Sequence, residues 1–407
     1  MPPVDVAGAV ELALDLAQRT EAGQPEIQIA QAVCNWAVDR SLPARVQHVG
    51  QFGANVLIGP DDGPELAFYG HLDTSLRLGP WDDTFLVSEA SPPPGPSSDG
   101  DILWGAGIGV ALAPSAAGLA VVASLRELAG PGRLGALIAS GGTHRAPPPW
   151  PVSAHGPMHP KMGAGVKAAL DSGFRPGAVL SPKGGAPAPL WEEPGSLYIA
   201  VSVREEFGPA LARPSGGQLA GAPAAAATVI RSIESWRNLY LAERLSRQGQ
   251  AGAEVTLGAL QAGSPSKPDL LPDTARLYLY VVTVPGDDDA AVTESLDEHL
   301  RSDAELGSLT VGVTAYGSLP AGRTEPSHPL VESVNAAWQR RLPLREVTGW
   351  RGSTDGALLR SLGVPTVRVG PEMLRHRRDP RLEGVRIADL GLFCEIWSEA
   401  ARSYLGC

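Results

Sequence analysis

The chain has 407 residues, of which 43% are hydrophobic and 19% charged, a balance typical of a folded globular protein. This length allows two domains, or one large domain with an insertion. The net charge of −11 argues against nucleic-acid binding. Three cysteines without paired spacing (Cys34, Cys394 and Cys407) favour a reducing compartment. The N-terminus shows no pattern of a secretory signal, so we expect a cytoplasmic protein.

Helical and strand patterns alternate through the first half of the chain. Such alternation predicts an α/β fold with a mainly parallel sheet covered by helices. The expected elements are two helices within 5–41, strands at 45–49, 55–58 and 65–69, a helix at 117–128, a strand at 134–139, a helix at 164–172 and a strand at 178–180.

Residues 102–125 form an uncharged run of 24 residues, long enough by count to cross a bilayer. The run is rich in glycine and alanine, contains Pro114, and is flanked directly by Asp101 and Arg126. A buried strand, loop and helix explain this composition better, so we expect no membrane segment.

The pattern changes after Pro194. Residues 197–203, 254–260, 275–284 and 309–316 alternate as strands, and 217–236 and 288–301 have helical spacing. The order β-α-β-β-α-β is that of a ferredoxin-like α+β unit. From residue 320 the α/β pattern returns, with helices at 329–340, 355–362 and 387–404 and a strand at 366–369. We therefore predict a core domain of residues 1–193 and 319–407, interrupted by an inserted lid or dimerisation domain of residues 194–318.

The first chemically distinctive motif is Gly70-His71-Leu72-Asp73, which follows an apolar run. A histidine at the end of a buried strand, with a carboxylate two residues later, suits a metal ligand oriented by its neighbour.

The motifs and their order resemble the zinc aminoacylase and carboxypeptidase superfamily, which includes acetylornithine deacetylases, succinyl-diaminopimelate desuccinylases and related dipeptidases. The resemblance covers nearly the whole chain and implies a peptidase-like fold. Besides residues 70–73, it rests on Trp81, Asp83-Thr84-Phe85, Gly105-Ala106-Gly107, Gly163-Ala164, Leu271-Pro272-Asp273, Gly352-Ser353-Thr354-Asp355, Gly363-Val364-Pro365-Thr366 and Gly370-Pro371.

In that family two zinc ions share a bridging carboxylate, and a glutamate activates water. His71 and Asp73 match the first ligand and its orienting acid. The other positions of the family pattern carry different residues: Val110 for the bridging aspartate, Leu112 for a lysine, Ser140 to His144 for the Glu-Glu pair, Ser181 for the carboxylate before a proline, and Asp379 for the last histidine if Glu383 is matched. The histidine of the family's inserted domain is replaced around Leu211.

A catalytic zinc needs about three protein ligands, and His71 alone cannot hold one. The substitutions agree with one another, since a bridging carboxylate without metal would be an uncompensated buried charge. We therefore predict no metal and no other cofactor.

Several residues are candidates for other roles at this position. His71 and Asp73 are a candidate acid/base pair, and His144 a candidate replacement for the family base. Their alternatives are an inherited hydrogen-bonded pair and a solvated loop histidine. The candidate substrate-binding residues are Ser181, Arg351, Ser353, Asp355 and His376. Arg351 suits an anion anchor or a surface salt bridge, Asp355 suits substrate binding or a cap of its following helix, and Lys183 suits an anion site or a solvated position.

Three functions fit this sequence. The first is a metal-free enzyme, in bacterial specialised amino-acid or natural-product biosynthesis, that binds an N-acyl or carrier-linked amino acid and promotes cyclisation, leaving-group displacement or condensation. The second is a non-catalytic protein that binds a partner or a carrier protein. The third is a zinc hydrolase with ligands rebuilt from His71, His144, His376 and Asp379. The resemblance also implies a homodimer or hetero-complex through the inserted domain.

Overall fold

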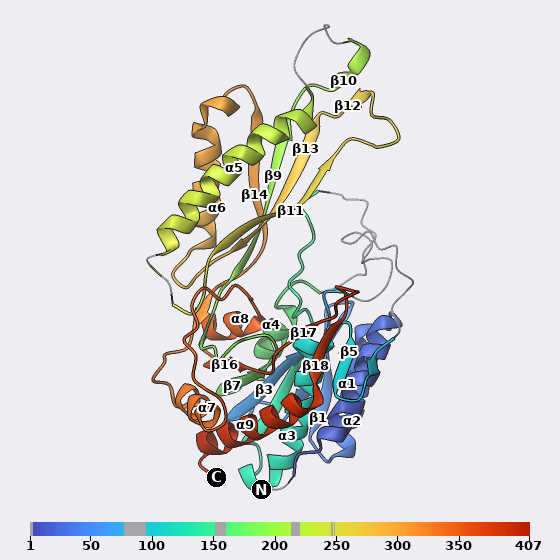
Figure 1. The fold of residues 1–407 in the computed structure, drawn as a ribbon, viewed down its shortest axis with the longest axis vertical. Coiled ribbons are helices and arrows are strands. Elements are labelled where there is room, and N and C mark those ends of the chain that lie inside the picture. Colours follow the sequence, from blue (N-terminus) through green and yellow to red (C-terminus); the bar gives the residue numbers. More distant parts are fainter. Residues whose placement is uncertain (1–2, 77–94, 151–159, 213–219, 246, 248) are drawn as a thin grey trace.

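The computed structural model describes residues 3–76, 95–150, 160–212, 220–245, 247 and 249–407. Trp81 and Asp83-Thr84-Phe85 lie outside these residues. A six-stranded central sheet fills the lower half of the view in Figure 1. Its strand order is β1 (Ala44–Val49), β2 (Gly53–Ile58), β6 (Leu134–Ala139), β3 (Leu66–His71), β7 (Ala178–Pro182) and β16 (Thr366–Val369).

The central sheet is mainly parallel, as predicted. The pairs β6–β3, β3–β7 and β7–β16 are parallel, whereas β2 runs antiparallel to both of its neighbours. Parallel strands place their carboxyl ends at one edge of the sheet, which is where ligands of α/β folds usually bind.

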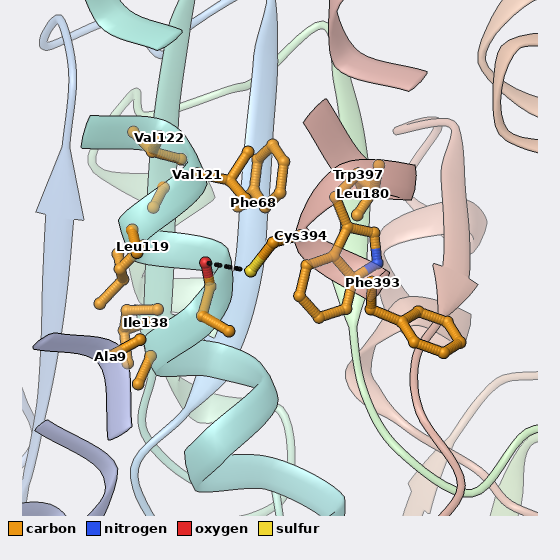
Figure 2. Close-up of a cluster of buried hydrophobic side chains, with 14 of the residues drawn as sticks. Ala9, Phe68, Leu119, Val121, Val122, Ile138, Leu180, Phe393, Cys394 and Trp397 are labelled. Carbon is orange, nitrogen blue, oxygen red and sulfur yellow. Dashed lines mark hydrogen bonds between the residues drawn. The ribbon is translucent and has the colours of Figure 1, made fainter. Parts of the chain in front are cut away.

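Helices cover both faces of this sheet, because alternate residues of its buried strands point to opposite sides. Phe68 of β3 packs in the core formed with α1 (Val6–Glu21), α2 (Glu26–Asp39), α3 (Ala113–Ala129), α7 (Pro329–Gln339) and α9 (Ile387–Leu405). Tyr69, the next residue, packs on the other face with α4 (Ala164–Asp171) and α8 (Asp355–Ser361). Figure 2 shows Phe68 in the first core with Cys394 and Trp397 of α9.

The uncharged run of the sequence is part of this core. It forms β5 (Ile102–Gly105), a π-helical turn (Ile108–Leu112) and α3, confirming the expected strand, loop and helix. Residues Ile108–Ala129 are long and apolar enough to span a membrane. However, 83% of the apolar 18-residue window within this segment is buried inside the protein. Pro114 does not break α3 because it lies in the first turn, where its missing N–H is not needed. The segment is therefore a core helix.

A second, antiparallel sheet occupies the upper half of Figure 1, with strand order β11 (Glu254–Ala262), β13 (Thr274–Val282), β9 (Ser196–Arg204) and β14 (Thr310–Leu319). Helices α5 (Ala222–Leu245) and α6 (Asp289–Ser302) share one core with it. This is the predicted β-α-β-β-α-β order. The boundaries proposed for the inserted domain stay predictions.

The sequence placed α5 wrongly at 217–236. Gly221, with a φ of +84°, precedes the helix, and α5 continues beyond Trp236 because Tyr240 packs on the same core. The sequence also missed a small sheet in the order β17 (Leu374–Arg375), β18 (Glu383–Arg386), β5 and β4 (Ser97–Ser98). Two further pairings of two-residue strands were also missed: β8 (Glu192–Glu193) with β15 (Gly322–Arg323), and β10 (Gly208–Pro209) with β12 (Leu270–Leu271). Strands this short carry no periodic pattern, so only tertiary pairing defines them.

Candidate active site

A buried lysine and a buried histidine meet at the carboxyl ends of two parallel strands. His71 is the last residue of β3, and Lys183 directly follows β7, the neighbour of β3. Lys183 is only 8% exposed and its Nζ lies 2.8 Å from Nε2 of His71. The interpretation of Lys183 as a solvated lysine is therefore wrong, and its role as an anion site stays a prediction. The sequence feature that could have indicated this contact is the position of Lys183 directly after Pro182, at the end of the strand that neighbours β3.

The hydrogen bonds of His71 define its tautomer. Nδ1 lies 2.9 Å from the backbone carbonyl oxygen of Asp73, which can only accept, so Nδ1 carries the proton. Nε2 is then an acceptor, and Lys183 donates to it. Burial, followed by the charge of Lys183, lowers the pKa of His71, which agrees with a neutral ring. We call His71, Asp73 and Lys183 the lysine–histidine site.

The Asp73 carboxylate is held by the loop that follows β6. It accepts hydrogen bonds from the backbone N–H of Gly142 at 2.9 Å and of Thr143 at 2.8 Å, and from the Thr143 hydroxyl. Burial alone would raise the pKa of Asp73, but the hydrogen bonds from His71 and Thr143 hold it well below its usual range. A Cβ on Gly142 would lie 2.5 Å from Cβ of His71, so only glycine fits there. Asp73 is thus a fixed anion beneath the histidine.

Asp355 and His144 form a second polar group beside the lysine–histidine site. Asp355 is fully buried, and its Oδ2 accepts a 2.7 Å hydrogen bond from the Tyr69 hydroxyl of β3. His144 Nδ1 lies 3.2 Å from the Ser196 hydroxyl, and its Nε2 lies 3.9 Å from Asp355 Oδ1. His144 is therefore not a solvated loop histidine. Asp355 does not cap α8 either, because the Thr354 side chain accepts the capping bond from Gly356.

A third buried carboxylate, Glu193, is paired with two arginines that the sequence did not single out. Its oxygens lie 2.5 Å from Arg360 and 3.3 Å from Arg368, and the Thr354 hydroxyl donates to both. Burial would raise the pKa of Glu193, but these arginines lower it overall. Arg360 is in α8 and Arg368 in β16, so their ion pairs with Glu193 hold α8 and β16 in position beside the site.

Burial, together with neighbouring charges, shifts the pKa of three groups of the site. Burial, followed by the charge of Arg368, lowers the pKa of Lys183 to about 8. Burial raises the pKa of Asp355 to about 7, although the Tyr69 hydrogen bond opposes the rise. Burial and the charge of Lys183 lower the pKa of His144 to about 3. An amine and a carboxyl that both titrate near neutral pH suit proton transfer.

The remaining predicted substrate-binding residues lie in different environments, some buried and one exposed. The hydroxyls of Ser181, in β7, and Ser353 are buried, with no hydrogen-bond partner among the described residues. Arg351 is 60% exposed and forms a 2.8 Å ion pair with Glu254, so the salt-bridge alternative describes it. The ring of His376 packs edge-on against Trp104, with 5.1 Å between centroids.

The donors around His71 do not fit a metal ion. In the part of the chain that the structure describes, no group of three or more His, Cys, Asp or Glu side chains could hold one. Both ring nitrogens of His71 are engaged in hydrogen bonds, Nδ1 with the Asp73 carbonyl and Nε2 with Lys183. At the bridging position, the Val110 backbone N–H donates to Glu383 instead. Asp379, a residue of the rebuilt-zinc alternative, is bound through both oxygens to Arg381.

Comparison with known proteins identifies the fold. No family model and no curated protein matches the sequence. Among solved structures, a tripeptidase from Staphylococcus aureus aligns with a TM-score of 0.69 at 15% identity, over 99% of this chain and 100% of its own. An M20 family metallo-carboxypeptidase from Sulfolobus solfataricus aligns with a TM-score of 0.69 at 12% identity, over 98% of this chain and 99% of its own. Human carnosine dipeptidase 1 aligns with a TM-score of 0.61 at 13% identity, over 99% of this chain and 100% of its own. The chain therefore has the fold of the M20 metallopeptidases.

Proposed function

We propose that this protein is a metal-independent enzyme on the M20 peptidase fold. Its substrate would be an N-acyl or carrier-linked amino acid, and its setting bacterial specialised amino-acid or natural-product biosynthesis in the cytoplasm. The observation that carries the proposal is the 2.8 Å contact between Lys183 Nζ and His71 Nε2. In this contact a lysine amine occupies one nitrogen of His71, the residue that the family resemblance matches to the first metal ligand.

The chemistry would be acyl transfer within the substrate or to a second one. In a cyclisation, a substrate amine attacks its own acyl carbon, the new N–C bond forms, and the bond to the leaving group breaks. The proton released by the amine must reach the leaving group, and neutral Lys183 can accept and return it. His71 orients the lysine amine, and Asp73 fixes His71 from the other side. Condensation or displacement by a second molecule would use the same proton path.

The test compares turnover with metal content. The purified protein would be incubated with N-acetyl, N-succinyl and thioester-linked amino acids, and products would be identified by mass spectrometry with and without a chelator. We expect product to form with a chelator present, and the zinc content of the purified protein to be far below one ion per chain. Turnover should fall at least 100-fold in Lys183→Met. The exposed-lysine control Lys167→Met should keep wild-type activity. Stoichiometric zinc with chelator-sensitive hydrolysis would overturn the proposal and support the rebuilt zinc site.

A second function, binding without catalysis, is favoured by the burial of the site. His71 and Asp73 are 3% exposed and Glu193 and Asp355 are 0% exposed, so the site side chains contact one another rather than solvent. A protein with this role would bind a partner or a carrier protein and leave amino-acid derivatives unchanged. Binding measured by calorimetry, with no product in the mass spectra after long incubation, would favour it over the enzyme.

The expected homodimer or hetero-complex through residues 194–318 is also a proposal. β11 is an edge strand of the second sheet and exposes Leu257 and Leu260. An exposed apolar edge is suited to pairing with another chain.

A further inference from the structure

The second sheet has an aromatic surface on the face away from its helices. Tyr198 of β9, Tyr278 and Tyr280 of β13, and Tyr316 of β14 lie together there, and we call them the tyrosine face. The rings of Tyr198 and Tyr280 are 5.6 Å apart between centroids, those of Tyr198 and Tyr316 5.6 Å, and those of Tyr278 and Tyr316 6.2 Å. The four rings therefore form one continuous surface.

Strand alternation and a bulge create this surface. In β13 the residues between the tyrosines, such as Leu277 and Leu279, pack on the core with α5 and α6, so the tyrosines point the other way. In β14 the pairing register shifts between Ala315 and Gly317. Such a bulge turns a side chain to a new direction, which here brings Tyr316 beside Tyr198.

The tyrosine face continues into the candidate active site. The Tyr198 hydroxyl donates a 2.6 Å hydrogen bond to the backbone carbonyl of His144, whose ring faces Asp355. Tyr198, Tyr280 and Tyr316 are half-buried, and the hydroxyls of Tyr280 and Tyr316 have no hydrogen-bond partner among the described residues. Burial raises the pKa of Tyr280 and of Tyr316 to about 12, so both stay neutral O–H donors.

The charges nearby decide what kind of group this face can accept. Aromatic clusters bind either cations, through the ring faces, or other aromatic rings, through edge and stacked contacts. The Arg276 guanidinium precedes the tyrosines along β13 and lies 5.3 Å from the Trp150 ring centroid. Burial raises the pKa of Tyr198, and the charge of Arg145 is close enough to oppose that rise. Two cations repel a cationic ligand and attract an anionic one.

We propose that the tyrosine face binds an aromatic ring of the substrate, and that this substrate also carries an acidic group. The inference rests on the proposed function, since it names the substrate class for the same site. The ring would lie against Tyr280 and Tyr316 while the amino-acid part reaches toward His144 and the lysine–histidine site.

Calorimetry with three probes tests the proposal: N-acetyl-L-tyrosine, N-benzoyl-L-alanine and the aliphatic N-acetyl-L-leucine. We expect at least one aromatic probe to bind ten-fold or more tightly than N-acetyl-L-leucine. The double variant Tyr280→Leu/Tyr316→Leu should lose this preference, whereas the Tyr→Phe pair should keep most of it. Tyr404→Leu, in α9, is the matched control and should behave as wild type.

Equal affinity for aromatic and aliphatic probes would overturn the inference, as would a preference that survives the double leucine variant with its fold intact by circular dichroism. Binding needs no turnover, so the two proposals fail separately. Tight aromatic binding without product counts against the enzyme alone, and turnover without aromatic preference counts against the tyrosine face alone.

Discussion

Replacing Lys183 by methionine should remove a defined part of the pH dependence of stability. The folded protein lowers the pKa of Lys183 from 10.5 to about 8, so between these values the unfolded chain binds more protons than the folded one. Unfolding free energy therefore rises with pH across that window. This lowering of the pKa corresponds to about 3–4 kcal/mol, at about 1.4 kcal/mol per pKa unit, and most of it falls between pH 7.5 and 10.5. Methionine has a similar length and no charge to titrate.

The assay is urea unfolding of wild type and Lys183→Met at pH 7.5, 8.5, 9.5 and 10.5. We expect the wild-type minus variant free energy to increase by about 3 kcal/mol over this range. Taking the difference cancels the titrating groups that lie far from Lys183 and that both proteins share. The exposed Lys167→Met variant should give a flat difference. If the Lys183 difference is also flat, the ammonium is not buried against His71 and the site described here is wrong.

Two further predictions follow from buried groups. Glu193→Gln should lower the unfolding free energy by about 3–5 kcal/mol, because it leaves two buried arginines without their counter-charge, while Glu305→Gln on the surface should change it by less than about 0.5 kcal/mol. A thiol reagent at pH 8 should modify Cys407 but not Cys394 in the folded protein, because burial raises the pKa of Cys394 to about 12; equal reaction rates would contradict that burial.

The regular elements were predictable because their patterns are long. β6 and β16 were placed at their observed bounds, and α1 and α2 fall within the expected range. The strands of two residues were not predictable, since nothing in two letters distinguishes them from loop. The extent of α5 was missed because its continuation depends on Tyr240 and the core that it meets in space.

The site was partly predictable. Motif position brought His71, Asp73, His144 and Asp355 into one neighbourhood, as the structure places them. Lys183 was misjudged because a lone lysine is usually solvated, and only the pairing of β3 with β7 puts it against His71. The Glu193 cluster could not be found in advance, since its members come from segments about 170 residues apart. Arg351 had the right composition for an anion site but faces Glu254.

The Lys183–His71 contact also bears on how such a fold can evolve. A carboxylate introduced at the buried position 181, two residues before Lys183, would need a counter-charge, which makes its effect depend on the Lys183 ammonium. Loss of the lysine alone would leave several buried acids short of a counter-charge. Substitutions of residues that share one set of buried charges are strongly coupled. The side chains around Lys183 are therefore expected to change together in related sequences, rather than one at a time.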